Sequence, residues 1–223
     1  SAPLPPEIHR QFEKRFSIPI IETMGLTETG AQILSNPLPP EIRKIGSPGV
    51  AYGNEVIVGD DNQNPVAANV EGEILVRGSN VMQGYLDRPE ETAKTITAEG
   101  WLRTGDLGRM DEDGFVFVTG RIKELIIKGG ENIAPREVDE ALLEHNAVLE
   151  AAAFPRACKD YGQRVEACVC LKKGHNTDEN ELREFCKNLI GAYKTPDRIY
   201  FLDDLPKGPS GKVQRIKLVD LTL

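Results

Sequence analysis

The chain has 223 residues, of which 39% are hydrophobic and 28% are charged, a composition typical of a globular protein of one or two domains. No apolar run approaches the roughly 18 residues that span a bilayer. Residues 1–6 also lack the basic segment and apolar core of a secretion signal. The sequence therefore argues against a membrane span and a secreted protein and predicts a cytoplasmic location.

The net charge of −8 comes entirely from residues 1–120, which hold 10 basic and 18 acidic side chains, whereas residues 121–223 hold 17 of each. A protein that wraps nucleic acid needs clustered Lys and Arg to replace counterions. The charge pattern therefore argues against a nucleic-acid partner, although the neutral second part can still contact a small phosphorylated ligand. The four cysteines form no C-x-x-C pair, which argues against a zinc site and a disulfide framework.

The first elements predicted are a helix, a strand and a polar loop. Prolines at 5–6 suit the first turn of a helix whose apolar residues recur every four positions up to Phe16. The β-branched run at 18–22 predicts a buried strand. It leads into a polar loop at 24–30, between two glycines.

Residues 45–119 change to short strands separated by turn signals, which predicts a small β-barrel or a distorted sheet. One helix interrupts them, where Asp87 is expected to cap the backbone and Glu90 to complete a capping box. The strands are expected at 55–58, 72–77 and 114–119.

After Gly120 strands and helices alternate, and about a hundred residues in this order predict a separate small domain. Pro135 opens one helix, and Asp178 with Glu181 begins another that Gly191 stops. The strands are expected at 125–127, 151–154 and 165–171. The fold class is thus α+β, with a domain boundary near 120–123.

Three glycine-rich pieces taken singly are more often ordinary turns, and none of them matches a Walker or dinucleotide fingerprint. Together and in order, however, five segments closely resemble successive motifs of the adenylate-forming superfamily, which contains acyl-CoA synthetases, luciferases and peptide-synthetase adenylation domains. The segments are Met24-Gly-Leu-Thr-Glu-Thr-Gly30, Gly72-Glu-Ile-Leu-Val-Arg-Gly78, Trp101-Leu-Arg-Thr-Gly-Asp106, the run 120–133 and Leu205-Pro-Lys-Gly-Pro-Ser-Gly-Lys212.

The resemblance covers nearly the whole chain and implies its domain organisation. Residues 1–120 match the C-terminal portion of the large adenylate-binding domain, with a β-subdomain at about 45–119, and residues 121–223 match the small mobile C-terminal lid domain. Family members carry a Ser/Thr/Gly-rich phosphate loop upstream of the first motif, and the sequence has no such loop. The chain is therefore expected to be the C-terminal fragment of a longer ligase, inactive without the missing N-terminal part.

The family's reaction has two steps. A carboxylate attacks the α-phosphate of ATP to give an acyl-adenylate and pyrophosphate, and a thiol then displaces AMP to give a thioester. The resemblance implies that Glu28 is the Mg²⁺ ligand and that the Thr27 hydroxyl bonds the phosphate. It also implies that Asp106 accepts both ribose hydroxyls, a geometry that suits two carboxylate oxygens, and that Arg121 bonds the ribose or a phosphate.

Three further residues complete the implied adenylation site. Met24 and Gly25 open the nucleotide-binding motif, although the family most often has Tyr at the methionine position, stacked near the adenine. Lys212 matches the family lysine whose ammonium bridges the substrate carboxylate and the α-phosphate.

The second step is implied to use another face of the small domain. Lys123 matches the hinge about which family members turn this domain between steps. The loop of Lys128, Gly129, Gly130 and Glu131 matches the one that enters the site in the thiol-accepting state, where residues without Cβ let the pantetheine arm pass close to the backbone.

The motifs at 25–28 and 123–133 look like those of CoA ligases, so the expected partners are coenzyme A and a small carboxylic acid. The acid itself and the oligomeric state cannot be identified from these residues. Two alternatives stay open: a ligase or adenylation domain that loads a carrier protein, and a non-catalytic interaction module that retains the fold.

Overall fold

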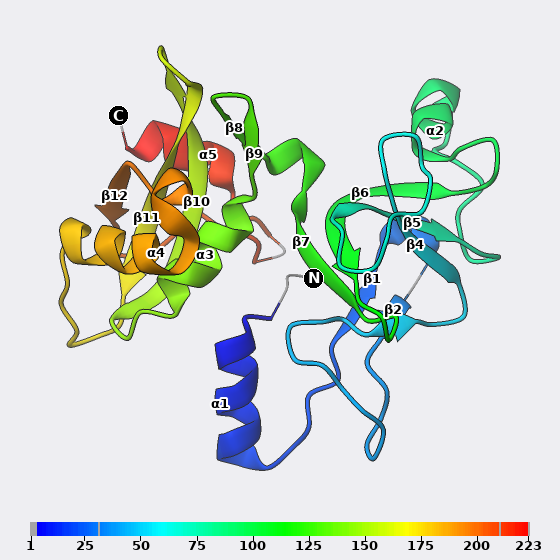
Figure 1. The fold of residues 1–223 in the computed structure, drawn as a ribbon, viewed down its shortest axis with the longest axis horizontal. Coiled ribbons are helices and arrows are strands. Elements are labelled where there is room, and N and C mark those ends of the chain that lie inside the picture. Colours follow the sequence, from blue (N-terminus) through cyan, green and yellow to red (C-terminus); the bar gives the residue numbers. More distant parts are fainter. Residues whose placement is uncertain (1–3, 31, 210, 223) are drawn as a thin grey trace. The chain divides into compact units, whose positions relative to one another are not determined.

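The computed structural model describes residues 4–30, 32–209 and 211–222. These residues contain both α-helices and β-sheets (Figure 1). They divide into two compact units, one ending at Ile122 and the other beginning at Lys123. The α+β fold class predicted from the sequence is confirmed by this mixture of elements.

The first unit begins with a helix and contains two antiparallel sheets, ordered β1-β2-β3 and β4-β5-β6-β7, with a second helix between β5 and β6. Its elements are α1 (Pro6–Phe16), β1 (Thr23–Gly25), the 3-10 helix η1 (Thr27–Thr29), β2 (Gln32–Ser35), β3 (Val50–Ala51), β4 (Glu55–Gly59), β5 (Gly72–Arg77), α2 (Pro89–Thr95), β6 (Leu102–Met110) and β7 (Val116–Arg121).

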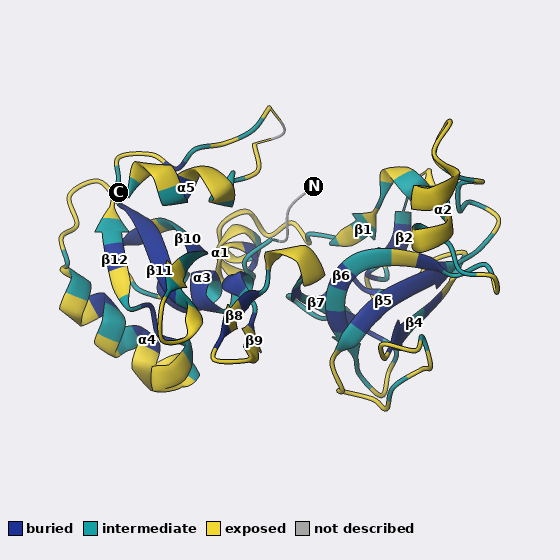
Figure 2. Ribbon diagram, turned by 90° about the horizontal axis from the view of Figure 1, so that it is seen from above, coloured by how far each residue is buried: buried dark blue, intermediate teal, exposed yellow. Residues whose placement is uncertain are grey.

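The second sheet of this unit is open, which corrects the barrel-like form expected at 45–119. Among the described residues, β4 and β7 each pair on one side only within this sheet, so the ladder does not close on itself. Its inner strand β5 carries a run of buried residues (Figure 2). The core of the unit forms where the two sheets contribute apolar side chains, namely Ile33, Leu34, Val56, Ile74, Val76 and Val116.

Two local predictions for the first unit are wrong. Residues 18–22 form no strand, because the Ile20 N–H that a ladder would use donates to Glu13 Oε1 at 2.7 Å. The helix near residue 90 begins at Pro89 after Arg88 and has no side-chain cap, since Asp87 adopts a left-handed φ of 55°.

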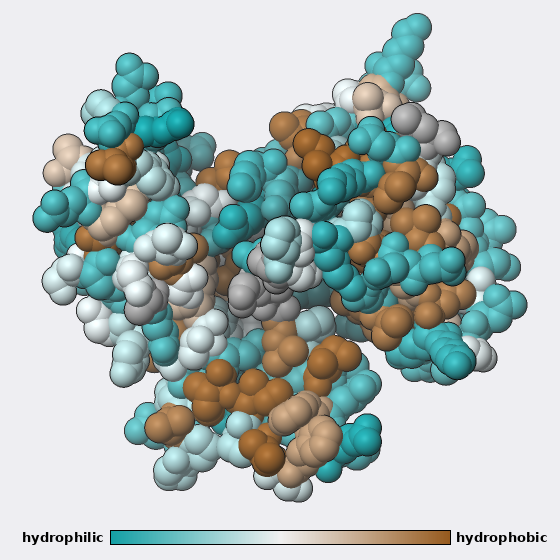
Figure 3. Space-filling view, turned by 180° about the vertical axis from the view of Figure 1, so that it is seen from behind, coloured by the Kyte–Doolittle hydropathy of each residue, from teal (hydrophilic) through white to brown (hydrophobic). Residues whose placement is uncertain are grey.

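Helix α1 leaves an apolar face uncovered by the described residues. Ile8, Phe12 and Phe16 follow the predicted four-residue spacing but are 50%, 38% and 51% exposed. Apolar side chains gather over α1 at the foot of the space-filling view (Figure 3). Within the described residues, no helix is both long and apolar enough to cross a bilayer.

The second unit is built on one sheet ordered β10-β11-β8-β9, with β12 pairing in parallel with β11. Its elements are the turn η2 (Ile122–Glu124, which begins in the first unit), β8 (Ile126–Lys128), β9 (Glu131–Ile133), α3 (Pro135–Leu143), β10 (Val148–Cys158), β11 (Gly162–Leu171), α4 (Glu179–Lys194), β12 (Arg198–Phe201) and α5 (Arg215–Leu221).

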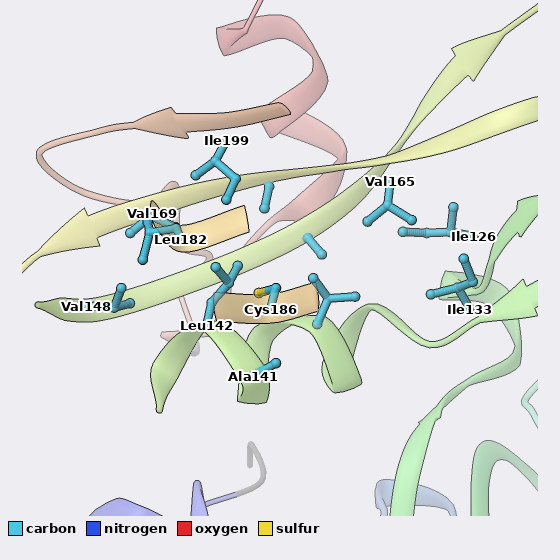
Figure 4. Close-up of a cluster of buried hydrophobic side chains, with 13 residues drawn as sticks. Ile126, Ile133, Ala141, Leu142, Val148, Val165, Val169, Leu182, Cys186 and Ile199 are labelled. Carbon is cyan, nitrogen blue, oxygen red and sulfur yellow. The ribbon is translucent and has the colours of Figure 1, made fainter. Parts of the chain in front are cut away.

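The main core of this unit lies between the sheet and helices α3 and α4 (Figure 4). Ala141 and Leu142 from α3 and Leu182 and Cys186 from α4 belong to this buried cluster, together with the sheet residues that the figure labels. A second cluster lies on the other side of β10 and β11. It packs Phe154, Cys168, Cys170, Leu205 and Leu218.

Helix α4 begins where the sequence predicted. Asp178 caps it by accepting the Glu181 N–H at 2.9 Å. Gly191 leaves the helical conformation with a φ of 78°, although a further turn continues to Lys194. An N-cap depends on residues within one helical turn, so the start of α4 could be predicted from the sequence.

Candidate functional site

Thr27 and Glu28 lie on η1, the turn between β1 and β2. Thr29, which is fully buried, fixes this turn by donating to Leu26 O at 3.0 Å while its hydroxyl accepts the Leu26 N–H at 3.2 Å. Gly30, with a φ of 64°, then turns the chain toward β2. The buried Thr29 thus holds the turn from its core side. The Thr27 side chain is exposed, and Glu28 is half-buried.

Glu28 is held by the segment that follows β5. Its backbone carbonyl accepts the Met82 N–H at 2.8 Å, and its Oε1 accepts the Tyr85 hydroxyl at 2.9 Å. Burial, with the Glu28 carboxylate, raises the pKa of Tyr85, so this phenol stays a donor at neutral pH. Among the described residues, Glu28 Oε2 has no hydrogen-bond donor in contact. One carboxylate oxygen therefore remains available to a ligand.

The described residues contain no group of three or more His, Cys, Asp and Glu side chains that could cage a metal ion. Glu28 would therefore hold a cation only in company with oxygens of a bound ligand. That donor set suits Mg²⁺, which usually takes one or two carboxylates together with substrate phosphates and waters.

Met24 and Gly25 form the end of β1, where the pairing with β2 is irregular. Met24 is half-buried and packs against the core of the first unit, whereas Gly25 is exposed. The structure thus gives the methionine a packing role in the core of the first unit.

Asp106 lies on β6 in a turn that the side chains of Thr104 and Glu73 hold. The Thr104 hydroxyl donates to Ile74 O at 2.7 Å and accepts the Asp106 N–H at 3.0 Å. The Gly105 N–H donates to Glu73 Oε1 at 3.0 Å, in a backbone conformation with a φ of 70° that favours glycine. The Thr104 hydroxyl and the N–H groups of Gly105 and Asp106 are thus all bonded, which fixes the backbone that carries the Asp106 carboxylate.

Glu73, which is 8% exposed, is the least expected member of this arrangement. Its second oxygen accepts Arg103 Nε at 2.9 Å, so the carboxylate connects both sides of the Thr104-Gly105 turn. A buried carboxylate needs such donors to offset its lost hydration. Sequence reasoning included Glu73 in a motif and assigned it no role.

Asp106 and Arg121 are cross-strand partners in the β6–β7 ladder and form an ion pair. Arg121 Nε lies 2.6 Å from Asp106 Oδ1, and Nη2 donates to Oδ2 at 3.4 Å. Asp106 is 3% exposed, whereas Arg121 reaches the surface. The pair presents an acceptor beside a cation, which is the chemistry that a ribose and a phosphate require.

In the second unit, Lys128, Gly129, Gly130 and Glu131 form the turn between β8 and β9. Gly129 and Gly130 have φ values of 56° and 88°, which favour glycine. A Cβ on Gly130 would meet no described atom within 4 Å, so the space beside that backbone is open. Glu131 is exposed.

The Lys128 side chain turns away from this open space. It is 7% exposed, and its Nζ donates to Tyr193 O at 3.1 Å and lies 3.5 Å from Asp197 Oδ2. The Tyr193 hydroxyl donates in turn to Lys128 O, and Gly129 N–H donates to Tyr161 O at 2.9 Å. Lys128 and two tyrosines thus brace the turn, which leaves its glycines as the accessible backbone.

Lys212 lies on the segment 205–214, which we call the lysine loop. Leu205 is buried at its start, and the loop closes where the Gln214 N–H donates to Pro206 O at 2.8 Å. Lys212 O accepts the Gly208 N–H at 2.8 Å, and the Lys212 side chain is exposed. Ser210 lies outside the described residues. Lys123, predicted as a hinge, is exposed within η2.

Two family models match the chain in succession. The model described as "AMP-binding enzyme" matches residues 1–86, and the model described as "AMP-binding enzyme C-terminal domain" matches residues 137–212. The chain belongs to the AMP-binding enzyme family. The resemblance to adenylate-forming enzymes inferred from the motifs is confirmed.

Among AMP-binding enzymes, a sulfoacetate–CoA ligase of Cupriavidus necator is 52% identical over 99% of this chain, and an oxalate–CoA ligase of Saccharomyces cerevisiae is 42% identical over 96%. The ATP-bound crystal structure of MatB from Rhodopseudomonas palustris matches all of the chain with a TM-score of 0.93 and 33% identity. The chain spans 43%, 40% and 45% of these three proteins, respectively.

Proposed function

We propose that this chain is part of an AMP-forming CoA ligase, which converts a small carboxylic acid, ATP and coenzyme A into an acyl-CoA, AMP and pyrophosphate. The observation that carries the proposal is the 52% identity to a sulfoacetate–CoA ligase over 99% of the chain. That similarity includes every segment from which the site was built. The part of the ligase that the chain does not span would supply the remaining groups.

The first unit would bind the nucleotide. Asp106 would accept the two ribose hydroxyls through its two oxygens, which Arg121 and the β6 turn already aim. The Arg121 guanidinium would remain beside the nucleotide and offset phosphate charge. The exposed Thr27 hydroxyl would donate to a phosphate oxygen.

Glu28 would hold Mg²⁺ together with ATP phosphate oxygens. Bound there, the cation would neutralise charge on the phosphates during transfer. The protein's own contribution is orientation, since the Tyr85 hydroxyl occupies Oε1 at 2.9 Å and leaves Oε2 for the ligand.

Lys212 would act in the first step. As the carboxylate closes on the α-phosphorus, negative charge from both groups meets at one place, and an ammonium there lowers the barrier. The Lys212 side chain is exposed and lies on a glycine-rich loop. Both features suit a lysine that enters the active site for one step only.

The second step would use the turn at 128–131. The open space beside Gly130 would admit the pantetheine arm close to the backbone, and the bracing by Tyr193 and Tyr161 would keep the turn in shape. Rotation of the second unit at Lys123 would withdraw Lys212 from the active site after the first step and bring the turn at 128–131 into it for the second. Such domain movements commonly separate the steps of one catalytic cycle.

Coenzyme A is the acceptor favoured over a carrier protein, because both curated relatives described above are CoA ligases. Sulfoacetate and oxalate both carry a second negative charge next to the reacting carboxylate. We therefore infer that the acid is a small one with a second acidic group. Cytoplasmic location remains our proposal, with the free thiols of four cysteines in keeping with a reducing compartment.

The test is a thioester assay of the complete ligase with ATP, Mg²⁺ and CoA against sulfoacetate, oxalate, malonate and acetate. We expect acyl-CoA and AMP with at least one of the diacids and a lower kcat/KM with acetate. AMP formation that stays undetectable with all four acids would contradict the proposed substrate class. Thioester on an added carrier protein but not on CoA would contradict the acceptor.

A further inference from the structure

The lysine loop leads directly into α5, whose first residue, Arg215, is held by a buried acid. Arg215 Nη2 lies 2.5 Å from Asp139 Oδ2, and Nη1 donates to Ala153 O at 2.8 Å and to Asp139 Oδ1 at 3.3 Å. Asp139 is 8% exposed, and its Oδ1 also accepts the Ala153 N–H at 2.6 Å. One guanidinium therefore joins α5 to both α3 and β10.

This contact lies at the base of the lysine loop. Two residues separate Arg215 from Lys212, and the second of them, Gln214, closes the loop through its bond to Pro206 O at 2.8 Å. The Gly208 N–H donates to Lys212 O at 2.8 Å, so the tip is built on that closed base. A displacement of Arg215 would therefore be passed to Lys212 through a short, hydrogen-bonded segment.

The chemistry of the contact requires arginine. The buried Asp139 carboxylate and the Ala153 carbonyl need several donors in a fixed plane, which a guanidinium provides and an ammonium does not. The remaining Arg215 nitrogen, Nε, lies 3.5 Å from Glu124 Oε2. Glu124 follows the proposed hinge residue Lys123, so the same side chain also contacts the segment that must turn.

We propose that Arg215 is a positioning residue for adenylation: through Asp139 it fixes the base of the lysine loop and thereby the direction of Lys212. The inference rests on the proposed function, in which Lys212 acts in the first step only. Misplacement of a catalytic group by about 1 Å can slow a reaction about a hundredfold. Loosening this contact therefore slows adenylation selectively.

The chain offers a matched control at the other end of α5. Arg156 on β10 donates to Val219 O at 3.1 Å and pairs through Nε with Glu166 Oε2 at 2.8 Å. Glu166 is fully buried. Arg156 thus also links α5 to a buried acid, but at the end of the helix far from Lys212.

The experiment compares Arg215→Lys with Arg156→Lys in the complete ligase. Pyrophosphate exchange measures adenylation, thioester formation from supplied acyl-adenylate measures the second step, and hydrogen exchange of the Gly208 and Gln214 amides measures the loop. We expect Arg215→Lys to slow pyrophosphate exchange at least about tenfold, to change the second step less than about twofold, and to speed both amides. Arg156→Lys should leave the ratio of the two steps and both amides unchanged.

Asp139→Asn is a second variant, which weakens the same contact from the acid's side. It should likewise slow pyrophosphate exchange and leave the second step nearly unchanged. A parallel fall in both steps would mean that Arg215 only stabilises the domain and would overturn the inference. Unchanged protection of the Gly208 and Gln214 amides in both variants would overturn it as well. If the wild-type ligase performs no pyrophosphate exchange, the proposed function fails, whereas the amide measurement still decides whether Arg215 fixes the loop.

Discussion

Replacing Glu73 by Gln tests how the structure fixes Asp106. The glutamate accepts the Gly105 N–H at 3.0 Å through one oxygen and Arg103 Nε at 2.9 Å through the other. Glutamine has the same shape but one acceptor oxygen, so its amide NH₂ must face one of these two donors. A hydrogen bond to a charged group contributes about 1.5–3 kcal/mol, and Glu73→Gln should therefore lower the free energy of unfolding by about 2 kcal/mol.

The assay is urea unfolding followed by circular dichroism, with Glu55→Gln as the control. Glu55 also pairs with an arginine across the same sheet, Arg77, at 2.6 Å, but both side chains are exposed. Exposed pairs contribute little, so the control should be much less destabilised. In the complete ligase, Glu73→Gln should also raise the KM for ATP, since the turn that aims Asp106 is loosened. Equal destabilisation by the two substitutions would mean that the buried Glu73 contacts contribute no more than an exposed ion pair.

Three further predictions concern separate parts of the chain. Gly130→Val should slow CoA transfer and spare pyrophosphate exchange in the complete ligase, whereas Gly174→Val, at an exposed glycine with a similar φ, should spare both steps. Equal loss of the two steps in Gly130→Val would contradict the proposal that this turn acts in CoA transfer. Burial raises the pKa of Cys168 to about 12, so in the native protein a thiol reagent at pH 8 should label the more accessible Cys158 far faster, and equal rates would contradict this packing. The Arg43 guanidinium holds the pKa of Glu13 at about 2 against its usual 4.5. Because the folded pKa is lowered, the ionised Glu13 stabilises the folded protein above pH 4.5, and this stabilisation is lost as pH falls toward 2. Thermal unfolding followed over that pH range should show a smaller loss of stability in Glu13→Gln than in the wild type.

The elements that the sequence located are those with short-range signals. Asp178 caps α4 through the N–H of a residue three positions on, and Pro135 opens α3 at its first residue. The motif residues Glu28 and Asp106 were likewise found because their neighbours in sequence carry the pattern.

The residues that sequence reasoning missed act over long separations. Tyr85 contacts Glu28 from 57 positions away, Glu73 contacts Gly105 from 32, and Arg215 contacts Asp139 from 76. No local periodicity reports such contacts. The predicted strand at 18–22 failed for a related reason, because a side chain of α1 takes the backbone donor that a ladder would need.

The proposed function is tested most directly by the effect of Lys212→Ala on the two half-reactions of the complete ligase. We expect pyrophosphate exchange to slow at least about a hundredfold, the scale expected when one cation is removed from a developing charge. Thioester formation from supplied acyl-adenylate should stay near the wild-type rate, because Lys212 is proposed to leave the site before that step. Near-normal pyrophosphate exchange, or an equal loss in both half-reactions, would contradict the account.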